Sequence, residues 1–223
     1  MILLAIETAT DACSAALAIG DEVLERFEIA PRAHTELILP MIDELMAEAG
    51  IRIAQVDALA FGRGPGAFTG VRIAVGVAQG IAFGADLPVV PVSTLAALAQ
   101  GMSTDKVLAA LDARMDEVYW GAYRRNAAGV MELDGEEYVS APGEVPLPSG
   151  QGWQGVGTGW AAYENALSGR CAGQINGWDG AVFPRARDVA ILGLAGYQAG
   201  QAVSAEQALP VYLRDKVTWQ KIR

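Results

Sequence analysis

A glycine-rich segment between an apolar run and a helical pattern is the strongest chemical signal in this 223-residue sequence. It reads Gly62-Arg63-Gly64-Pro65-Gly66-Ala67-Phe68-Thr69-Gly70-Val71-Arg72. Its closely spaced glycines permit positive φ angles and close backbone approach, and amides that open a helix favour an anion. The segment lacks the GK[ST] of a P-loop, and Thr69 replaces the third glycine of a dinucleotide motif. A ligand-free turn and an anion-binding turn both remain open.

Four acidic residues flank two turns that follow apolar strand patterns. Glu7 and Asp11 flank the first turn, and Asp112 and Asp116 flank the second. In a two-lobed ATP-binding enzyme, such acids face the cleft and hold metal and phosphate. Acidic turn residues also satisfy the local backbone without a ligand. No glycine lies between Glu7 and Thr10 for phosphate to approach, so the local turn role is favoured and the metal role stays open.

Nucleophiles and metal ligands are sparse in this sequence. It has one histidine, His34, and two cysteines, Cys13 and Cys171, which form no CxxC pair. Neither cysteine has a basic sequence neighbour that would favour a thiolate, and no serine lies in a G-x-S-x-G motif. His34 precedes a helical pattern, so we expect it to be a surface or capping residue. The sequence therefore predicts no catalytic residue, no metal site and no cofactor bound by this chain alone.

Apolar periodicity predicts the elements that position these residues. Strands are expected at residues 2–6, 13–19, 23–29, 56–61, 87–92, 107–111, 118–124, 131–138 and 154–156. Helices are expected at residues 35–49, 68–83, 93–100 and 185–199. The first three strands form an antiparallel meander, Thr35 and Ser93 are the expected N-caps, and Gly50 ends the first helix.

The pattern restarts about halfway along the chain. A shift of 105 residues aligns the apolar run and both acids of the two turns: Ile2-Leu3 with Val107-Leu108, Glu7 with Asp112, and Asp11 with Asp116. Such a match arises from a duplication or from chance, and both explanations stay open. A duplication predicts two similar lobes joined near residues 101–105.

The composition limits the class of protein. Hydrophobic residues make up 52%, charged residues 19%, and the formal net charge is -10. This composition fits a globular chain with a large core. It argues against this chain making the main contact with a nucleic acid, because phosphate contacts need clustered Lys and Arg. No basic region precedes the first apolar run and the cysteines form no framework, so we expect a cytoplasmic protein. The longest apolar stretch, residues 67–85, contains Arg72, Gln79 and several glycines, so we expect no membrane span.

The helix expected at residues 68–83 contains glycines at every fourth position, Gly76 and Gly80, and Gly84 follows. Each glycine inside a helix costs about 1 kcal/mol relative to alanine, which suggests a packing reason. The row packs either on the chain's own sheet or on a helix of a partner or second copy. For the second case, the expected contact residues are Thr35, Leu37, Met41, Leu45, Phe68, Val71, Arg72, Val75, Gly76, Gln79 and Gly80.

Several motifs together resemble the TsaB (YeaZ) family, whose members are needed for threonylcarbamoyladenosine formation in tRNA. They extend along nearly the whole chain: residues 4–14, His34-Thr35-Glu36, Leu39-Pro40, residues 62–73, 111–115 and 156–160, and Pro210-Val211-Tyr212-Leu213-Arg214. The most specific motif is the loop of Gly62, Arg63, Gly64, Pro65, Gly66, Thr69 and Gly70.

The resemblance implies an α/β protein with the two-lobed actin-like (ASKHA) fold of sugar kinases and Hsp70 ATPases, with duplicated mixed sheets flanked by helices. It implies a first lobe over residues 1–103, a smaller lobe over 104–205, and a final segment, about 206–223, that returns to the first lobe. Ala9 stands where actin-like ATPases have a phosphate-loop glycine. Glu7 replaces the aspartate usual in the family, and we expect it to be tolerated.

The resemblance also implies a non-catalytic subunit. The catalytic relative, TsaD, carries two metal-binding histidines after the strand equivalent to residues 87–92, and this chain has Ser93-Thr94-Leu95 there. With TsaD and the ATPase TsaE, such a subunit supports transfer of threonylcarbamoyl from its adenylate to adenosine 37 of tRNAs that read codons starting with A. It pairs with TsaD or with itself through the two helices of the first lobe.

The implied ligands and the rival functions follow from the same resemblance. ATP or ADP is expected only in the complex, and tRNA contact is expected to be indirect or weak. Three rivals remain: a peptidase acting on a partner protein, a small kinase-like ATPase, and a homodimer with a separate binding role.

Overall fold

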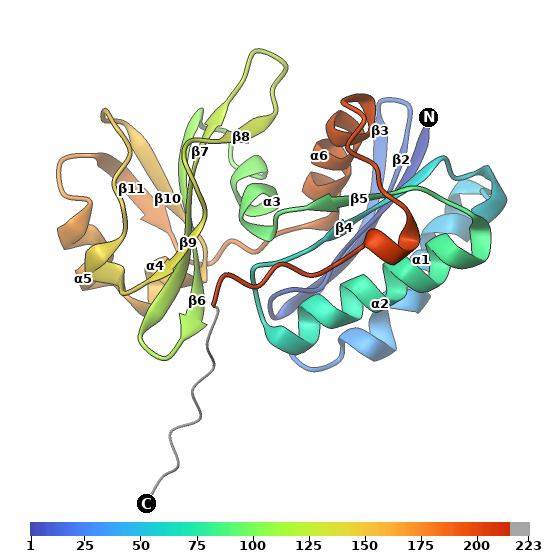
Figure 1. Cartoon of the computed structure of the whole chain (residues 1–223), viewed down its shortest axis with the longest axis horizontal. Coiled ribbons are helices and arrows are strands. Elements are labelled where there is room, and N and C mark those ends of the chain that lie inside the picture. Colours follow the sequence, from blue (N-terminus) through green and yellow to red (C-terminus); the bar gives the residue numbers. More distant parts are fainter. Residues whose placement is uncertain (215–223) are drawn as a thin grey trace, which may run out of the picture.

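The structure, a computed structural model, describes residues 1–214 and has two lobes, each built on one mixed β-sheet (Figure 1). The first sheet contains β1 (Ile2–Glu7), β2 (Ala12–Ile19), β3 (Glu22–Ile29), β4 (Ala58–Gly62) and β5 (Val89–Val92). The second contains β6 (Lys106–Arg114), β7 (Glu117–Arg125), β8 (Met131–Leu133), β9 (Tyr138–Ser140), β10 (Trp153–Val156) and β11 (Ile175–Asp179).

The two sheets have the same topology. The strand order is β3-β2-β1-β4-β5 in the first and, from its matching edge, β8-β7-β6-β10-β11 in the second, where β9 also pairs with β7. In each sheet the first strand pairs antiparallel on one side and parallel on the other. This match supports duplication rather than coincidence, and it confirms the expected two-lobed α/β class with duplicated mixed sheets.

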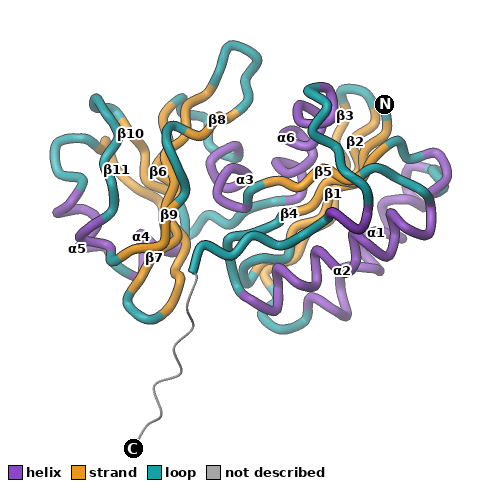
Figure 2. The backbone as a smooth tube through the Cα atoms, viewed as in Figure 1, coloured by secondary structure: helices purple, strands orange, loops and turns teal. Residues whose placement is uncertain are grey.

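Helices cover both faces of the first sheet (Figure 2). On one face lie α1 (His34–Ala49) and α2 (Phe68–Ala85), and on the other lies α6 (Ala186–Gln198). Successive residues of a strand point to opposite faces. Accordingly, Leu4 joins the core under α1 and α2, whereas Leu3 joins the core under α6.

The second lobe packs in the same way. Its sheet is covered on one face by α4 (Thr158–Ala162) and α5 (Glu164–Arg170), where the Trp120 and Trp160 rings lie 5.9 Å apart. On the other face lies α3 (Thr94–Gln100), which also packs against α6. Helix α3 therefore links the two lobes. Short 3₁₀ turns complete the chain at Ile53–Gln55, Pro142–Glu144 and Ala205–Gln207.

The chain returns to the first lobe earlier than the expected boundary at residue 205. Helix α6 packs against β1, β2 and β4 of the first sheet. Its fit is close, because a Cβ on Gly193 would lie 2.5 Å from the Cβ of Ala60. Arg185, which precedes the helix, pairs with Glu25 of β3 through Nε at 3.1 Å. The segment 104–205 is therefore not one structural unit.

The other differences between the predicted and the observed elements are local. The strand expected at residues 131–138 is two short strands, β8 and β9, interrupted at Gly135 with φ 103°. Elements α4, α5 and β11 had no predicted counterpart. Helix α1 has Ala33 rather than Thr35 as its N-cap residue and contains Pro40. The predicted end at Gly50 and the Ser93 cap, whose Oγ accepts from the Ala96 amide, are confirmed.

Candidate functional site

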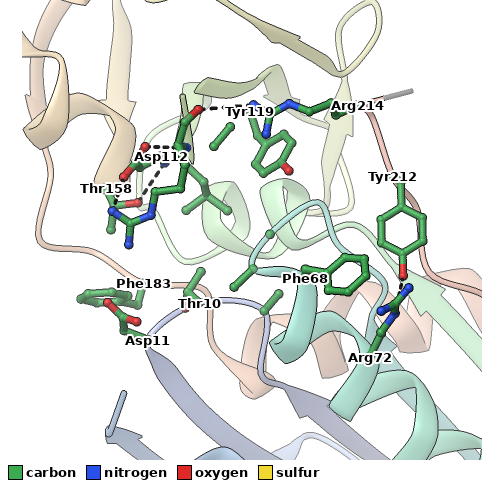
Figure 3. A pocket seen from close by; sticks show the side chains of 16 residues that line it. Thr10, Asp11, Phe68, Arg72, Asp112, Tyr119, Thr158, Phe183, Tyr212 and Arg214 are labelled. Carbon is green, nitrogen blue, oxygen red and sulfur yellow. Dashed lines mark hydrogen bonds and ion pairs between the residues drawn. The ribbon is translucent and has the colours of Figure 1, made fainter. Parts of the chain in front are cut away.

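The two turns that carry the candidate acids face each other across a cleft of about 1050 Å³ between the lobes (Figure 3). The β1–β2 turn contributes Thr10 and Asp11, and the end of β6, beside the β6–β7 turn, contributes Asp112 and Arg114. Of the four predicted acids, the structure thus brings Asp11 and Asp112 to one cavity. Glu7 lies fully buried beneath its turn.

The glycines of the signature loop serve a close approach of the backbone. A Cβ on Gly66 would lie 2.4 Å from the Ala9 carbonyl oxygen, and one on Gly70 would lie 2.1 Å from that of Thr8. Two hydrogen bonds close the contact: the Ala67 amide donates to Ala9 O at 2.7 Å, and the Thr8 hydroxyl donates to Gly70 O at 2.7 Å. The start of α2 therefore occupies the space beside the β1–β2 turn, which favours the ligand-free explanation of the loop.

The buried side chain of Glu7 has room because the neighbouring strand β4 has a glycine beside it. A Cβ on Gly62 would lie 2.0 Å from Glu7 Oε2. The carboxylate accepts hydrogen bonds from the Ala9 amide at 2.7 Å and from the Thr94 hydroxyl at 3.1 Å. Burial nevertheless raises the pKa of Glu7 to about 7, because desolvation outweighs these bonds. The carboxyl group thus joins β1, the turn and α3 in the interior.

Replacing Glu7 by glutamine is expected to change how stability depends on pH. The folded pKa lies above the ordinary value of 4.5, so the native state retains a proton that the unfolded chain releases. The free energy of unfolding of the parent protein therefore falls as pH rises from about 4.5 to about 7 and then levels off. Glutamine does not titrate, so E7Q should not lose this stability. The free energy of unfolding of E7Q relative to that of the parent should therefore rise by up to about 3 kcal/mol between pH 4.5 and 8.

Urea unfolding at pH 5 and pH 8 measures this difference. Burial also raises the pKa of Asp188 to about 7, but that group contributes equally to both proteins. E36Q makes the same change at an exposed carboxylate and controls for the loss of one negative charge. Parallel pH dependence of E7Q and the parent would contradict the buried, protonated state of Glu7.

The β6–β7 turn shows local backbone chemistry. Arg114, Met115 and Asp116 all have left-handed backbones, with φ between 58° and 61°. Asp112 supports them, because its Oδ1 accepts from the Arg114 amide at 2.8 Å and its Oδ2 pairs with the Arg114 guanidinium at 3.0 Å. Its carboxylate also accepts from the Tyr163 hydroxyl at 3.3 Å. These contacts agree with the turn role that the sequence favoured for Asp112.

Residues 208–214, which we call the C-terminal strap, run between the lobes. On the first lobe, Ala208 O accepts from Gln79 Nε2 at 3.0 Å, and the Val211 amide donates to Arg63 O at 2.9 Å. On the second lobe, Arg214 donates through Nε to Glu117 at 3.1 Å. The described part of the expected final segment thus reaches the first lobe and then the second. Residues 215–223 lie outside the described residues.

Aromatic rings and one guanidinium fix the strap at the start of α2 (Figure 3). The Arg72 guanidinium carbon lies 3.4 Å from the centre of the Phe68 ring, and Arg72 Nε donates to the Tyr212 hydroxyl at 3.0 Å. The Phe68 and Tyr212 rings are 5.9 Å apart. This stack joins the exposed side of α2 to the wall of the cleft.

The glycine row of α2 faces outward. Gly76, Gly80 and Gly84 are exposed, and a Cβ on any of them would meet no atom of residues 1–214 within 4 Å. The parallel row of alanines at positions 74, 78 and 82 packs inward against the first sheet. Packing of the glycine row on the chain's own sheet, the alternative left open by the sequence, is therefore wrong.

The predicted contact residues divide into surface and core. Thr35, Phe68, Arg72, Gly76 and Gly80 are exposed. Leu37 and Gln79 are half-buried. Four others belong to the core and offer no surface to a partner: Met41, Leu45, Val71 and Val75.

Sequence reasoning missed two exposed apolar residues on these helices. Phe83 is 75% exposed and Leu39 is 51% exposed. Phe83 follows Gly80 by three positions, so the helical spacing places it on the same face. We call the exposed side of α2 the α2 face; it comprises Phe68, Arg72, Gly76, Gly80, Phe83 and Gly84.

The single histidine and the cysteines have structural roles. His34 is buried rather than on the surface, and its Nε2 donates to Thr10 O at 2.8 Å, which ties α1 to the β1–β2 turn. Burial raises the pKa of Cys13 and of Cys171 to about 11, so both thiols stay protonated at neutral pH. Within residues 1–214, no group of three or more His, Cys, Asp and Glu side chains is arranged to hold a metal ion.

One helix of the described chain, α2, is long and apolar enough by length and composition to cross a membrane, with a mean hydropathy of 1.3. In the structure its inner side packs against β4 and β1.

Comparisons with known proteins agree with this architecture. The family model described as "TsaD: tRNA N6-adenosine threonylcarbamoyltransferase" matches residues 26–221. Two curated proteins named tRNA threonylcarbamoyladenosine biosynthesis protein TsaB are similar over 100% of this chain. The one from Escherichia coli is 43% identical over 98% of its own length, and the one from Haemophilus influenzae is 42% identical over 97%.

Two solved structures from Pseudomonas aeruginosa are also similar. The one described as YeaZ has 47% sequence identity and a TM-score of 0.89, and the match covers 95% of this chain and 99% of that one. The other is described as an uncharacterized protein with similarity to peptidase YEAZ, and it has the same identity and TM-score over 96% of this chain and 99% of that one.

Proposed function

Because the chain belongs to the TsaB (YeaZ) family and has its two-lobed actin-like fold, we propose that it is the non-catalytic activating subunit of a tRNA-modifying complex. That complex transfers threonylcarbamoyl from its adenylate to N6 of adenosine 37 in tRNAs that read codons starting with A. A TsaD-type protein supplies the catalytic metal site and a TsaE-type ATPase joins the assembly. The complex works in the cytoplasm.

The α2 face carries this proposal. Gly76 and Gly80 cost helix stability, and a Cβ on either would touch nothing among residues 1–214, so we place their benefit in an interface with another chain. Phe83, exposed at 75%, and Phe68, exposed at 57%, flank the glycines with apolar surface. A smooth strip between two large rings suits a helix of a TsaD-type partner or of a second copy.

The packed β1–β2 turn supports a role without independent ATP hydrolysis. In an actin-like ATPase a glycine of this turn lies beside the phosphates, whereas here Ala9 takes that position and its carbonyl oxygen accepts from the Ala67 amide of the signature loop. Nucleotide therefore belongs to the assembled complex rather than to this chain alone. With a net charge of -10, the chain makes at most weak contact with tRNA.

Reconstitution tests the proposal. The reaction would contain a TsaD-type protein, a TsaE-type ATPase, the enzyme that makes threonylcarbamoyl-adenylate, ATP, threonine and unmodified tRNA, with and without this chain. Mass spectrometry would count modified adenosine. We expect product only when the chain is present. Equal product without it would overturn the proposal, and proteolysis by the pure chain would restore the peptidase alternative.

A further inference from the structure

A second pocket, of about 440 Å³, lies between the lobes on the other side of the C-terminal strap. The strap is the wall between the two cavities, because alternate side chains of this extended segment point to opposite sides. Tyr212 and Arg214 line the cleft described above. Val211 and Leu213 line the second pocket. None of the roles assigned so far uses this second pocket.

The first-lobe side of the second pocket carries an arginine without a partner. Arg63 is anchored by its backbone, since its amide donates to Val92 O at 2.8 Å and its carbonyl accepts from Val211. Its side-chain Nε is buried and has no hydrogen-bond partner among residues 1–214. No carboxylate of those residues forms an ion pair with its guanidinium. A half-buried guanidinium is costly unless paired, so this one favours an anionic group in the pocket.

The second-lobe side carries a carboxylate that two hydroxyl groups hold in place. Glu137 Oε1 accepts from the Tyr123 hydroxyl at 2.5 Å and from the Ser93 hydroxyl. Burial and the neighbouring carboxylate raise the pKa of Tyr123, so this phenol stays protonated and donates. Both bonds end on the same oxygen, so no hydrogen bond among residues 1–214 occupies Glu137 Oε2. The exposed Glu136 adds a second negative charge at the rim.

The two sides together specify the charge of the ligand. A phosphate would meet Arg63 but would be repelled by Glu136 and Glu137. A cation alone would leave Arg63 unpaired. A small zwitterion satisfies both sides, and the remaining lining from Met131, Val211 and Leu213 is apolar.

We propose that this second pocket binds a free α-amino acid with a small apolar side chain. Its carboxylate pairs with the Arg63 guanidinium and its ammonium group pairs with Glu137, so the ligand bridges the two lobes. Charge-assisted hydrogen bonds at each end fix its orientation, and apolar residues of the strap and β8 lie beside its side chain. This site is independent of the α2 face and of tRNA modification.

Calorimetric titration of the full chain tests the site with four probes. They are L-valine, isovalerate, which lacks the ammonium group, isobutylamine, which lacks the carboxylate, and inorganic phosphate. We expect valine to bind one per chain. Each single-charge analogue should bind at least about tenfold more weakly, because one charged hydrogen bond is lost. Phosphate should give no heat. Phosphate binding without valine binding, or no binding of any probe, would overturn the proposal.

Variants connect binding to the two charged residues. R63Q and E137Q should each weaken valine binding at least about tenfold, whereas R52Q, a change at an exposed arginine outside the pocket, should bind like the parent. R63K retains the charge and should bind more strongly than R63Q, which separates charge from folding if R63Q is unstable. Unchanged valine affinity in folded R63Q and E137Q would show that the amino acid binds elsewhere.

Discussion

Replacement of Gly80 by leucine is expected to abolish association through the α2 face and, with it, formation of modified tRNA. The new side chain would project from the middle of the glycine row into the space that a partner helix must enter. The isolated chain should fold, because no atom of the described part of the chain lies within 4 Å of a Cβ at this position. Leucine should even strengthen the helix by up to about 1 kcal/mol. Gel filtration and pull-down with a TsaD-type protein measure association, and thermal unfolding measures stability.

A matched change in the second lobe controls for the added leucine. Gly169 is also exposed, helical and free of neighbours within 4 Å, but it lies in α5, far from the α2 face in the sequence. G169L should associate and support product formation like the parent. G76L should behave like G80L. If G80L unfolds, the glycine row supports the monomer instead, and if G80L associates normally, partners dock on another surface.

The first lobe was predictable because its sequence pattern is regular. The continuous apolar runs of β1 and β2, the alternation of β3 and the glycine that ends α1 predicted the meander and the helix with errors of one or two residues. In the second lobe, β11 contains Asn176 and Gly177, and α5 buries a single residue, Leu167. Such elements are held by tertiary packing rather than by periodicity, so no local pattern could have located them.

Only part of the orientation of α1 and α2 on the first sheet could be predicted from the sequence. Helix α2 has small residues on two parallel rows, so spacing alone could not tell which row is buried. The structure places Ala78 inside and Gly80 outside. Helix α1 is apolar on more than one stripe, and the inward stripe includes Met41 and Leu45. The second pocket could not be predicted from the sequence, because Arg63 and Glu137 come to line one pocket only through the packing of the two lobes.

Replacement of Gly70 by alanine is expected to destabilise the chain strongly, even though alanine is the better helix former. A Cβ at this position would lie 2.1 Å from the Thr8 carbonyl oxygen and 3.3 Å from Ala9 Cα. Both neighbours are backbone atoms of a buried turn, so neither can rotate away. Overpacking against fixed atoms costs about 3 kcal/mol, and separation of the turn from α2 also weakens the Thr8 to Gly70 hydrogen bond. Urea unfolding would measure this loss.

The change from glycine to alanine at the other end of α2 should stabilise the chain rather than destabilise it. Gly84 is helical, exposed and free of neighbours within 4 Å, so G84A should gain about 0.5–1 kcal/mol from helix propensity alone. Opposite signs within one helix would show that Gly70 is required by the β1–β2 turn. Equal stabilisation of both variants would mean that the turn can move, and the space beside Ala9 could then open to a phosphate after all.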